Sequence, residues 1–116
     1  MHELSVLVEI VRVVEELAKE QSIKKVKAIV LEVGELSSVV PQFMTEYFPV
    51  IVDLKPMFKD TELIIEMLPG NAICNECKTV FNVIENKGYC PSCGSFEKDL
   101  LSGQELSIKE IQVPED

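Results

Sequence analysis

Residues 74–94 read CNECKTVFNVIENKGYCPSCG and contain all four cysteines of the 116-residue chain. The cysteines form two Cys-x-x-Cys pairs that are separated by twelve residues. Each pair predicts a tight knuckle that points two sulfurs at one centre, and two knuckles supply the tetrahedron of thiolates that Zn²⁺ prefers. Gly94 suits the second knuckle, because a residue without a Cβ can bring its N–H close to a sulfur. The spacing therefore predicts a structural zinc site on Cys74, Cys77, Cys90 and Cys93.

The segment around these cysteines, residues 70–98, predicts a small folded module. Thr79 to Ile84 has the composition of a strand and Asn86-Lys87-Gly88 that of a turn, which is the layout of a zinc ribbon. Domains below roughly 40 residues usually need a metal or disulfides to fold. Zinc binding would therefore supply the folding free energy of this module.

Other uses of four cysteines stay open at this point. Rubredoxin-type iron also binds four thiolates at such spacing. A redox dithiol needs only one Cys-x-x-Cys pair and a βαβ context, which this sequence lacks. Disulfides are disfavoured in the reducing cytoplasm, where we expect the protein to reside. Because four thiolate ligands leave no open coordination position, we do not expect catalysis at this metal.

Outside the module, two amphipathic helices are predicted. The first runs from Glu3 to about Gln21, because apolar residues recur there at steps of three and four. Its apolar stripe is Leu4, Leu7, Val11, Val14 and Leu17–Ala18. The second lies between Val39 and Met57: Pro41 suits its first turn, Pro49 should kink or restart it, and Pro56 should end it.

Three strands are also predicted, over Lys24–Gly34, Glu62–Leu68 and Glu105–Val113. The first is apolar on both faces, so we expect it at the centre of a sheet. In the third, the alternation slips between Ile108 and Ile111, which a bulge near Lys109–Glu110 would explain. The fold class is therefore α+β: a small antiparallel or mixed three-stranded sheet with two helices and an inserted zinc-ribbon module. We expect residues 1–69 and 99–116 to form one domain and residues 70–98 the other.

Composition excludes several classes of function. The net charge is −9 and the pI is near 4.6, whereas binding to phosphates or to anionic membranes requires Lys and Arg. Residues 70–98 contain as many lysines as acids, so the remaining chain carries the whole net charge. The N-terminus lacks the basic region of a signal peptide, and no apolar run reaches the length of a membrane span. We expect a cytoplasmic protein with no nucleic-acid or membrane partner.

The single histidine of the chain is residue 2. A histidine at a frayed terminus usually carries no function. However, the terminal amine of Met1, the amide nitrogen of His2 and its imidazole can form fused chelate rings around one metal ion. Glu3 could add a carboxylate oxygen or its own amide nitrogen. Such nitrogen-rich, near-planar ligand sets suit Ni(II) or Cu(II), and binding would be pH-dependent because the donors must lose protons.

Motifs along nearly the whole chain resemble those of the HypA/HybF family, nickel metallochaperones for [NiFe]-hydrogenase maturation. These motifs are MHELS (residues 1–5), LEVGELSSV (residues 31–39), the two cysteine pairs, SGQEL (residues 102–106) and IKEI (residues 108–111). Pro49 departs from the unbroken second helix that this resemblance leads us to expect. The departure concerns the straightness of the helix and not the metal sites.

The resemblance implies a site and a function. His2 would be the essential nickel ligand, aided by the terminal amine of Met1, nearby backbone nitrogens and Glu3, and zinc would be structural. The protein would deliver Ni²⁺ to the hydrogenase large subunit together with a GTPase of the HypB type, and in some bacteria the family also serves urease. The alternatives are a zinc-ribbon module that binds protein or nucleic acid, and an enzyme. The sequence lacks a Gly-rich phosphate loop and a second histidine, so we expect no enzymatic activity.

Overall fold

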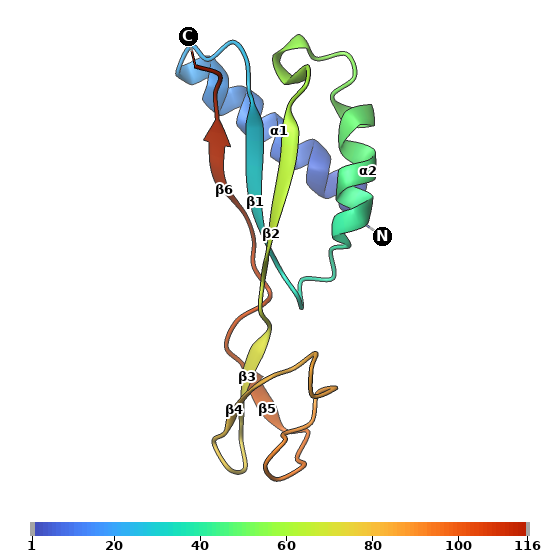
Figure 1. The fold of residues 1–116 in the computed structure, drawn as a ribbon, viewed down its shortest axis with the longest axis vertical. Helices are drawn as coiled ribbons and strands as arrows, with labels where there is room; N and C mark the ends of the chain where they lie inside the picture. The colour runs from blue at the N-terminus through green and yellow to red at the C-terminus, as the bar shows by residue number, and fades with distance from the viewer. Residues whose placement is uncertain (1, 116) are drawn as a thin grey trace. The chain divides into compact units, whose positions relative to one another are not determined.

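The structure, a computed structural model, describes residues 2–115 and contains two compact units. Unit 1 comprises Met1–Leu31, Val39–Glu66 and Ser107–Asp116, and unit 2 comprises Glu32–Ser38 and Met67–Leu106. The elements, labelled in Figure 1, follow in the order α1 (Glu3–Glu20), β1 (Ala28–Gly34), α2 (Pro41–Ile51), the 3₁₀ helix η1 (Pro56–Phe58), β2 (Glu62–Leu68), β3 (Asn71–Cys74), β4 (Val80–Asn82), β5 (Lys98–Leu100) and β6 (Leu106–Gln112).

The predicted first helix is confirmed as α1, but its buried stripe differs from the predicted one. The apolar residues that α1 buries are Leu7, Ile10, Val11, Val14 and Ala18. Leu4 and Leu17, which the periodicity assigned to the core, are exposed, and the stripe begins instead with the carboxylate residue Glu3. Since residues 3, 7, 10 and 14 also recur at steps of four and three, the spacing alone is compatible with either stripe.

The sheet of three long strands has the order β2-β1-β6, so the prediction that the first strand is central is confirmed. Hydrogen bonds from Lys27 N–H to Gln112 O and from Gly34 N–H to Glu105 O run antiparallel between β1 and β6. In contrast, the bonds Glu62 N–H to Lys27 O and Glu35 N–H to Leu68 O advance together along both strands, so β1 and β2 are parallel. Parallel strands need a crossover, and α2 lies within it. Figure 1 shows α1 crossing one face of this mixed sheet.

The second helix differs from its prediction at its C-terminal end. Helix α2 starts at Pro41, as expected, and continues past Pro49 to Ile51 without a break. Pro49 lies in the last turn, so the one backbone hydrogen bond that its missing N–H removes is close to the end of the helix. The helix does not restart, and Pro56 begins η1 instead of ending α2. This short helix ends at Phe58, which is one of the largest buried side chains.

Unit 2 contains the second sheet, whose order is β4-β3-β5. Strand β3 pairs antiparallel with both neighbours, so Ala72 lies opposite Phe81 on one side and Leu100 on the other. Of these strands only β4 was predicted, and it is shorter than the expected Thr79–Ile84. The hydrophobic cluster beside these strands is small, and its buried residues are Ala72, Cys74, Phe81 and Cys90. With two helices, two three-stranded sheets and a ribbon-type cysteine cluster, the predicted α+β fold class is confirmed.

Backbone segments of unit 2 approach closely at Gly103. This residue has φ 102°, a conformation that favours glycine, and a Cβ placed on it would lie 2.4 Å from Gly70 Cα. A Cβ placed on Gly34 would lie 2.0 Å from the carbonyl oxygen of Gly103. The three segments that carry these glycines can therefore meet only because none of the three residues has a side chain.

Candidate metal sites

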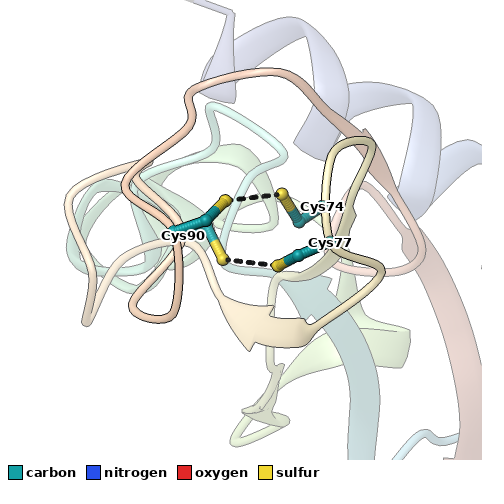
Figure 2. A group of neighbouring side chains, drawn as sticks. Cys74, Cys77 and Cys90 are labelled. Atoms are coloured by element: carbon teal, nitrogen blue, oxygen red, sulfur yellow. Dashed lines mark hydrogen bonds between the residues drawn. The ribbon is translucent and has the colours of Figure 1, made fainter.

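The four cysteines of unit 2 converge on one point. Their Sγ atoms all lie within 4.8 Å of one another. The Sγ atoms of Cys74 and Cys93 are 3.5 Å apart, as are those of Cys77 and Cys90. Figure 2 shows the side chains of Cys74, Cys77 and Cys90 pointing toward a common centre. Cys74 and Cys90 are buried, whereas Cys77 and Cys93 are exposed. The sequence prediction that the two pairs share one centre is therefore confirmed as geometry.

The two pairs form knuckles with matching backbone hydrogen bonds. In the first, Lys78 N–H donates to Cys74 O at 2.9 Å, and in the second, Gly94 N–H donates to Cys90 O at 2.8 Å. The residue after each pair is left-handed, with φ 66° at Lys78 and φ 78° at Gly94. An added Cβ on Gly94 would meet no atom within 4 Å, so glycine is favoured there by backbone conformation and not by lack of space.

Hydrogen bonds and burial shift the pKa values of three of the thiols, downward for Cys74 and Cys77 and upward for Cys93. The hydroxyl and backbone N–H of Thr79, followed by the thiol of Cys90, lower the pKa of Cys77 to about 6. The backbone N–H of Cys77 and then that of Glu76 lower the pKa of Cys74, against the effect of burial. The pKa of Cys93 rises to about 12: the N–H of Ser95 lowers it, but the Cys74 sulfur and burial raise it by more. The raised pKa of Cys93 is the effect expected where sulfurs crowd together, since adjacent like charges disfavour one another.

These sulfurs fit a tetrahedral zinc ion. Four sulfurs at about 2.3 Å from Zn²⁺ lie roughly 3.8 Å from one another in a tetrahedron. The two closest pairs here are 3.5 Å apart and no pair exceeds 4.8 Å, so small rotations of the side chains would complete the shell. Cys74, Cys77, Cys90 and Cys93 would hold the ion, which would cross-link the two knuckles and contribute no open coordination position.

The second candidate site, His2, lies at the N-cap of α1 in unit 1. Its carbonyl oxygen accepts hydrogen bonds from Val6 N–H at 2.9 Å and from Ser5 Oγ at 3.0 Å, so its backbone is held by the first helical turn. The residue is exposed, and its side chain makes no capping hydrogen bond. An exposed imidazole that is not engaged in capping the helix can be reached by a metal ion from solution. Met1, whose amine belongs to the predicted chelate, lies outside the described residues.

The neighbouring residue, Glu3, is arranged differently. Its carboxylate is buried, and Oε2 accepts a hydrogen bond from Val40 N–H at 3.0 Å. Bonds from the backbone N–H of Val40 and from its own N–H lower the pKa of Glu3, against the effect of burial, and the nearby His2 charge adds to the lowering. Sequence reasoning missed this contact. The one available signal was the spacing of Glu3 from Leu7 and Ile10, which places all three on one helical face.

The fold and the cysteine cluster thus define a small α+β protein with a ribbon-type cluster of four cysteines. A family model described as "Hydrogenase/urease nickel incorporation, metallochaperone, hypA" matches residues 1–113. The chain therefore belongs to the HypA family of nickel-incorporation metallochaperones, as its sequence motifs predicted. Within the described residues, no helix has the length and apolar character needed to cross a membrane.

Individual relatives match over nearly their whole length. The chain is 34% identical over 113 residues to the hydrogenase maturation factor HypA of Geobacter sulfurreducens, covering 97% of this chain and 99% of the relative. It is 37% identical over 115 residues to that of Trichodesmium erythraeum, covering 99% and 97%. The solution structure of the nickel metallochaperone HypA from Helicobacter pylori matches with a TM-score of 0.67 and 25% identity, over 97% of each chain.

Proposed function

We propose that this protein binds Ni(II) through His2 and delivers it to the large subunit of [NiFe]-hydrogenase, while the four cysteines hold a structural Zn²⁺. The observation that carries the nickel part is the exposed residue His2, whose side chain makes no capping hydrogen bond and whose backbone is held by the first turn of α1. Membership of the nickel-incorporation family supports the direction of transfer. In this proposal residues 1–69 and 99–116 form the nickel-binding domain, and residues 70–98 form the zinc-ribbon domain.

The proposed nickel ligands are the imidazole and amide nitrogen of His2, the terminal amine of Met1 and a donor from Glu3. Nitrogen donors of this kind suit Ni(II). His2 is exposed, so the ion can be passed on without unfolding the chain. The GTPase of the HypB type is the proposed partner in transfer, urease is a second proposed recipient, and the cytoplasm is the proposed compartment.

A calorimetric nickel titration of the zinc-loaded protein tests the N-terminal site. We expect about one Ni²⁺ per chain, and we expect that His2→Ala abolishes this binding without changing the fold. Adding two residues before Met1 should also abolish binding, because the terminal amine is moved away from His2. The matched control is the same extension after Asp116, which should bind like the original chain. If both N-terminal changes leave the titration unaltered, the N-terminal site is wrong.

Elemental analysis tests the zinc site. Untreated protein should contain one zinc per chain, whereas iron would indicate a rubredoxin-type centre, and no metal with oxidised cysteines would indicate disulfides. Removing zinc with a chelator should abolish hydrogen-exchange protection in β3, β4 and β5, because the hydrophobic cluster around the cysteines contains only four buried residues. Protection in α1 should remain, since unit 1 has its own core.

The competing interpretation is a zinc-ribbon module that binds protein or nucleic acid. The net charge of −9 disfavours nucleic acid, because phosphate contacts need cationic side chains. A gel-shift assay with duplex DNA and RNA at low salt should therefore show no complex. Delivery itself is tested by incubating the nickel-loaded protein with the immature large subunit and measuring nickel in each after separation.

A further inference from the structure

Unit 2 carries an open apolar groove of about 430 Å³ on the surface of the cysteine module. Its apolar walls are Leu36, Val83, Ile84, Phe96 and Leu100. The groove does not include any cysteine, so it is separate from the proposed zinc site. More large apolar side chains line it than form the buried core of the module.

The exposure of these walls is unusual for a module with so small a core. Phe96 is 57% exposed and Ile84 is 54% exposed. A domain that depends on a metal for folding has few apolar side chains with which to form a core. Contiguous apolar side chains that remain exposed generally mark an interaction surface. The groove is therefore a candidate docking surface.

Phe96 is exposed but held in place. Its ring packs at 57° against Tyr89, with the ring centroids 5.2 Å apart. Lys98 Nζ lies over the ring of Phe96, 3.4 Å from its centroid. A Cβ placed on Gly88 would lie 2.8 Å from Phe96 Cε1, so the ring rests directly on the glycine backbone. A side chain that is already ordered loses little conformational entropy when a partner covers it.

The charges at the groove indicate what would fit it. Among the described residues, Lys87 and Lys98 are the charged ones that line it, and no acidic side chain does. Lys98 Nζ is fixed by a hydrogen bond to Phe96 O at 3.0 Å. In a chain with a net charge of −9, this is a locally cationic, apolar site. A second copy of the chain is disfavoured because two copies of this net charge repel each other.

We propose that this groove binds an extended segment of a partner protein in which apolar side chains alternate with carboxylates. The apolar side chains lie between Ile84 and Phe96, and the carboxylates pair with Lys87 and Lys98. The open shape suits a peptide and not an enclosed small molecule. The proposal is independent of nickel binding at His2.

Chemical-shift mapping on the ¹⁵N-labelled, zinc-loaded full chain tests it. The probe is the peptide acetyl-Glu-Leu-Asp-Phe-Glu-Leu-Asp-amide, and the control has lysine at each acidic position. We expect the acidic peptide to shift the amide signals of Ile84, Gly88, Phe96 and Leu100 at concentrations up to about 1 mM, and the basic peptide to affect this groove at least about tenfold more weakly.

Matched variants locate the binding. Ile84→Asp and Lys87→Glu should each weaken binding at least about tenfold. Val80→Asp alters an exposed apolar residue of the same module outside the groove, and Lys25→Glu makes the same charge change in unit 1. Both controls should bind the acidic peptide normally, as should His2→Ala, and zinc content should be equal in all variants.

Three results would overturn the proposal. The first is the absence of shifts at the groove, and the second is equal affinity of the groove for both peptides. The third is a shift of the groove signals with protein concentration alone, which would assign the surface to self-association. Because none of these measurements involves nickel, their failure would leave the nickel-delivery proposal intact.

Discussion

The carboxylate of Glu3 accepts a hydrogen bond from the backbone N–H of Val40, with 3.0 Å between Oε2 and N. This bond links the first residue of α1 to the N-cap residue of α2. Glu3 is 2% exposed, and its Oε1 is buried with no hydrogen-bond partner in the described part of the chain. A buried carboxylate at the N-terminal end of α1 is favoured by the helix dipole. The hydrogen bond from Val40 holds Glu3, the residue next to His2, in place.

Replacing Glu3 separates its structural contact from a role as nickel ligand. The amide oxygen of Glu3→Gln can still accept the bond from Val40, whereas Glu3→Ala leaves that N–H unpaired. We expect the Tm to fall further for Glu3→Ala than for Glu3→Gln. We also expect Glu3→Gln to bind about one nickel per chain, because the carboxylate is engaged with Val40. Loss of nickel binding in Glu3→Gln at an unchanged Tm would instead make the carboxylate a ligand.

Glu35 provides a pH-dependent contribution to the stability of unit 2. Its Oε1 accepts hydrogen bonds from Gly70 N–H at 2.7 Å and from Asn82 Nδ2 at 3.2 Å. These bonds, with Gly70 first, lower the pKa of Glu35 below its ordinary value of 4.5. Because the folded pKa is the lower one, the stabilisation is present above pH 4.5 and is lost as the pH falls through the folded value.

A carboxyl ¹³C titration checks this prediction. The midpoint for Glu35 should lie below 4.5 in the original chain and should move toward 4.5 in Asn82→Ala. Asn86 donates to the carbonyl of Asn82 and not to Glu35, so Asn86→Ala should leave the midpoint unchanged. A midpoint at or above 4.5 in the original chain would contradict the hydrogen-bond account.

The two knuckles predict opposite effects of substitution at equivalent positions. Gly94→Ala should destabilise the zinc-loaded protein by about 1–2 kcal/mol, which is the cost of a left-handed conformation for a residue with a Cβ. Lys78→Gly should stabilise it by about 0.5–1 kcal/mol, because glycine relieves that cost, and the entropy that glycine adds to the unfolded chain offsets only part of the gain. Urea denaturation of both variants measures the two changes. A loss of stability in Lys78→Gly would show that the lysine side chain matters more than its backbone.

Phe58 is predicted to be a main support of the core of unit 1. It is almost fully buried, so Phe58→Ala should reduce the free energy of unfolding by about 3–5 kcal/mol. Leu54, four residues earlier, is 91% exposed, and Leu54→Ala should change the free energy of unfolding by no more than about 0.5 kcal/mol. Thermal unfolding of the two variants and of the original chain measures both changes. Similar losses in both variants would mean that the segment between α2 and β2 packs differently.

The sequence predicted features that depend on local pattern. The existence of α1 and the central place of β1 follow from periodicity and from apolar residues on both faces of a strand. The face of α1 that is buried did not follow, because Leu4 and Glu3 both fit the spacing and packing selected Glu3. The C-terminal end of α2 did not follow either, since Pro49 is tolerated in a last turn and Phe58 is drawn into the core by contacts outside its own segment.

The sequence alone determined that the four cysteine sulfurs meet, because Cys-x-x-Cys spacing acts over a few residues. It also determined the family, through motifs spread along the chain. Only the tertiary structure decided that Glu3 turns inward to Val40 and that Phe96 and Ile84 share a groove. These pairs are far apart in sequence, and their contacts form only when packing brings the segments together. Local preferences fix which elements form, whereas long-range packing fixes which side chains remain available for partners.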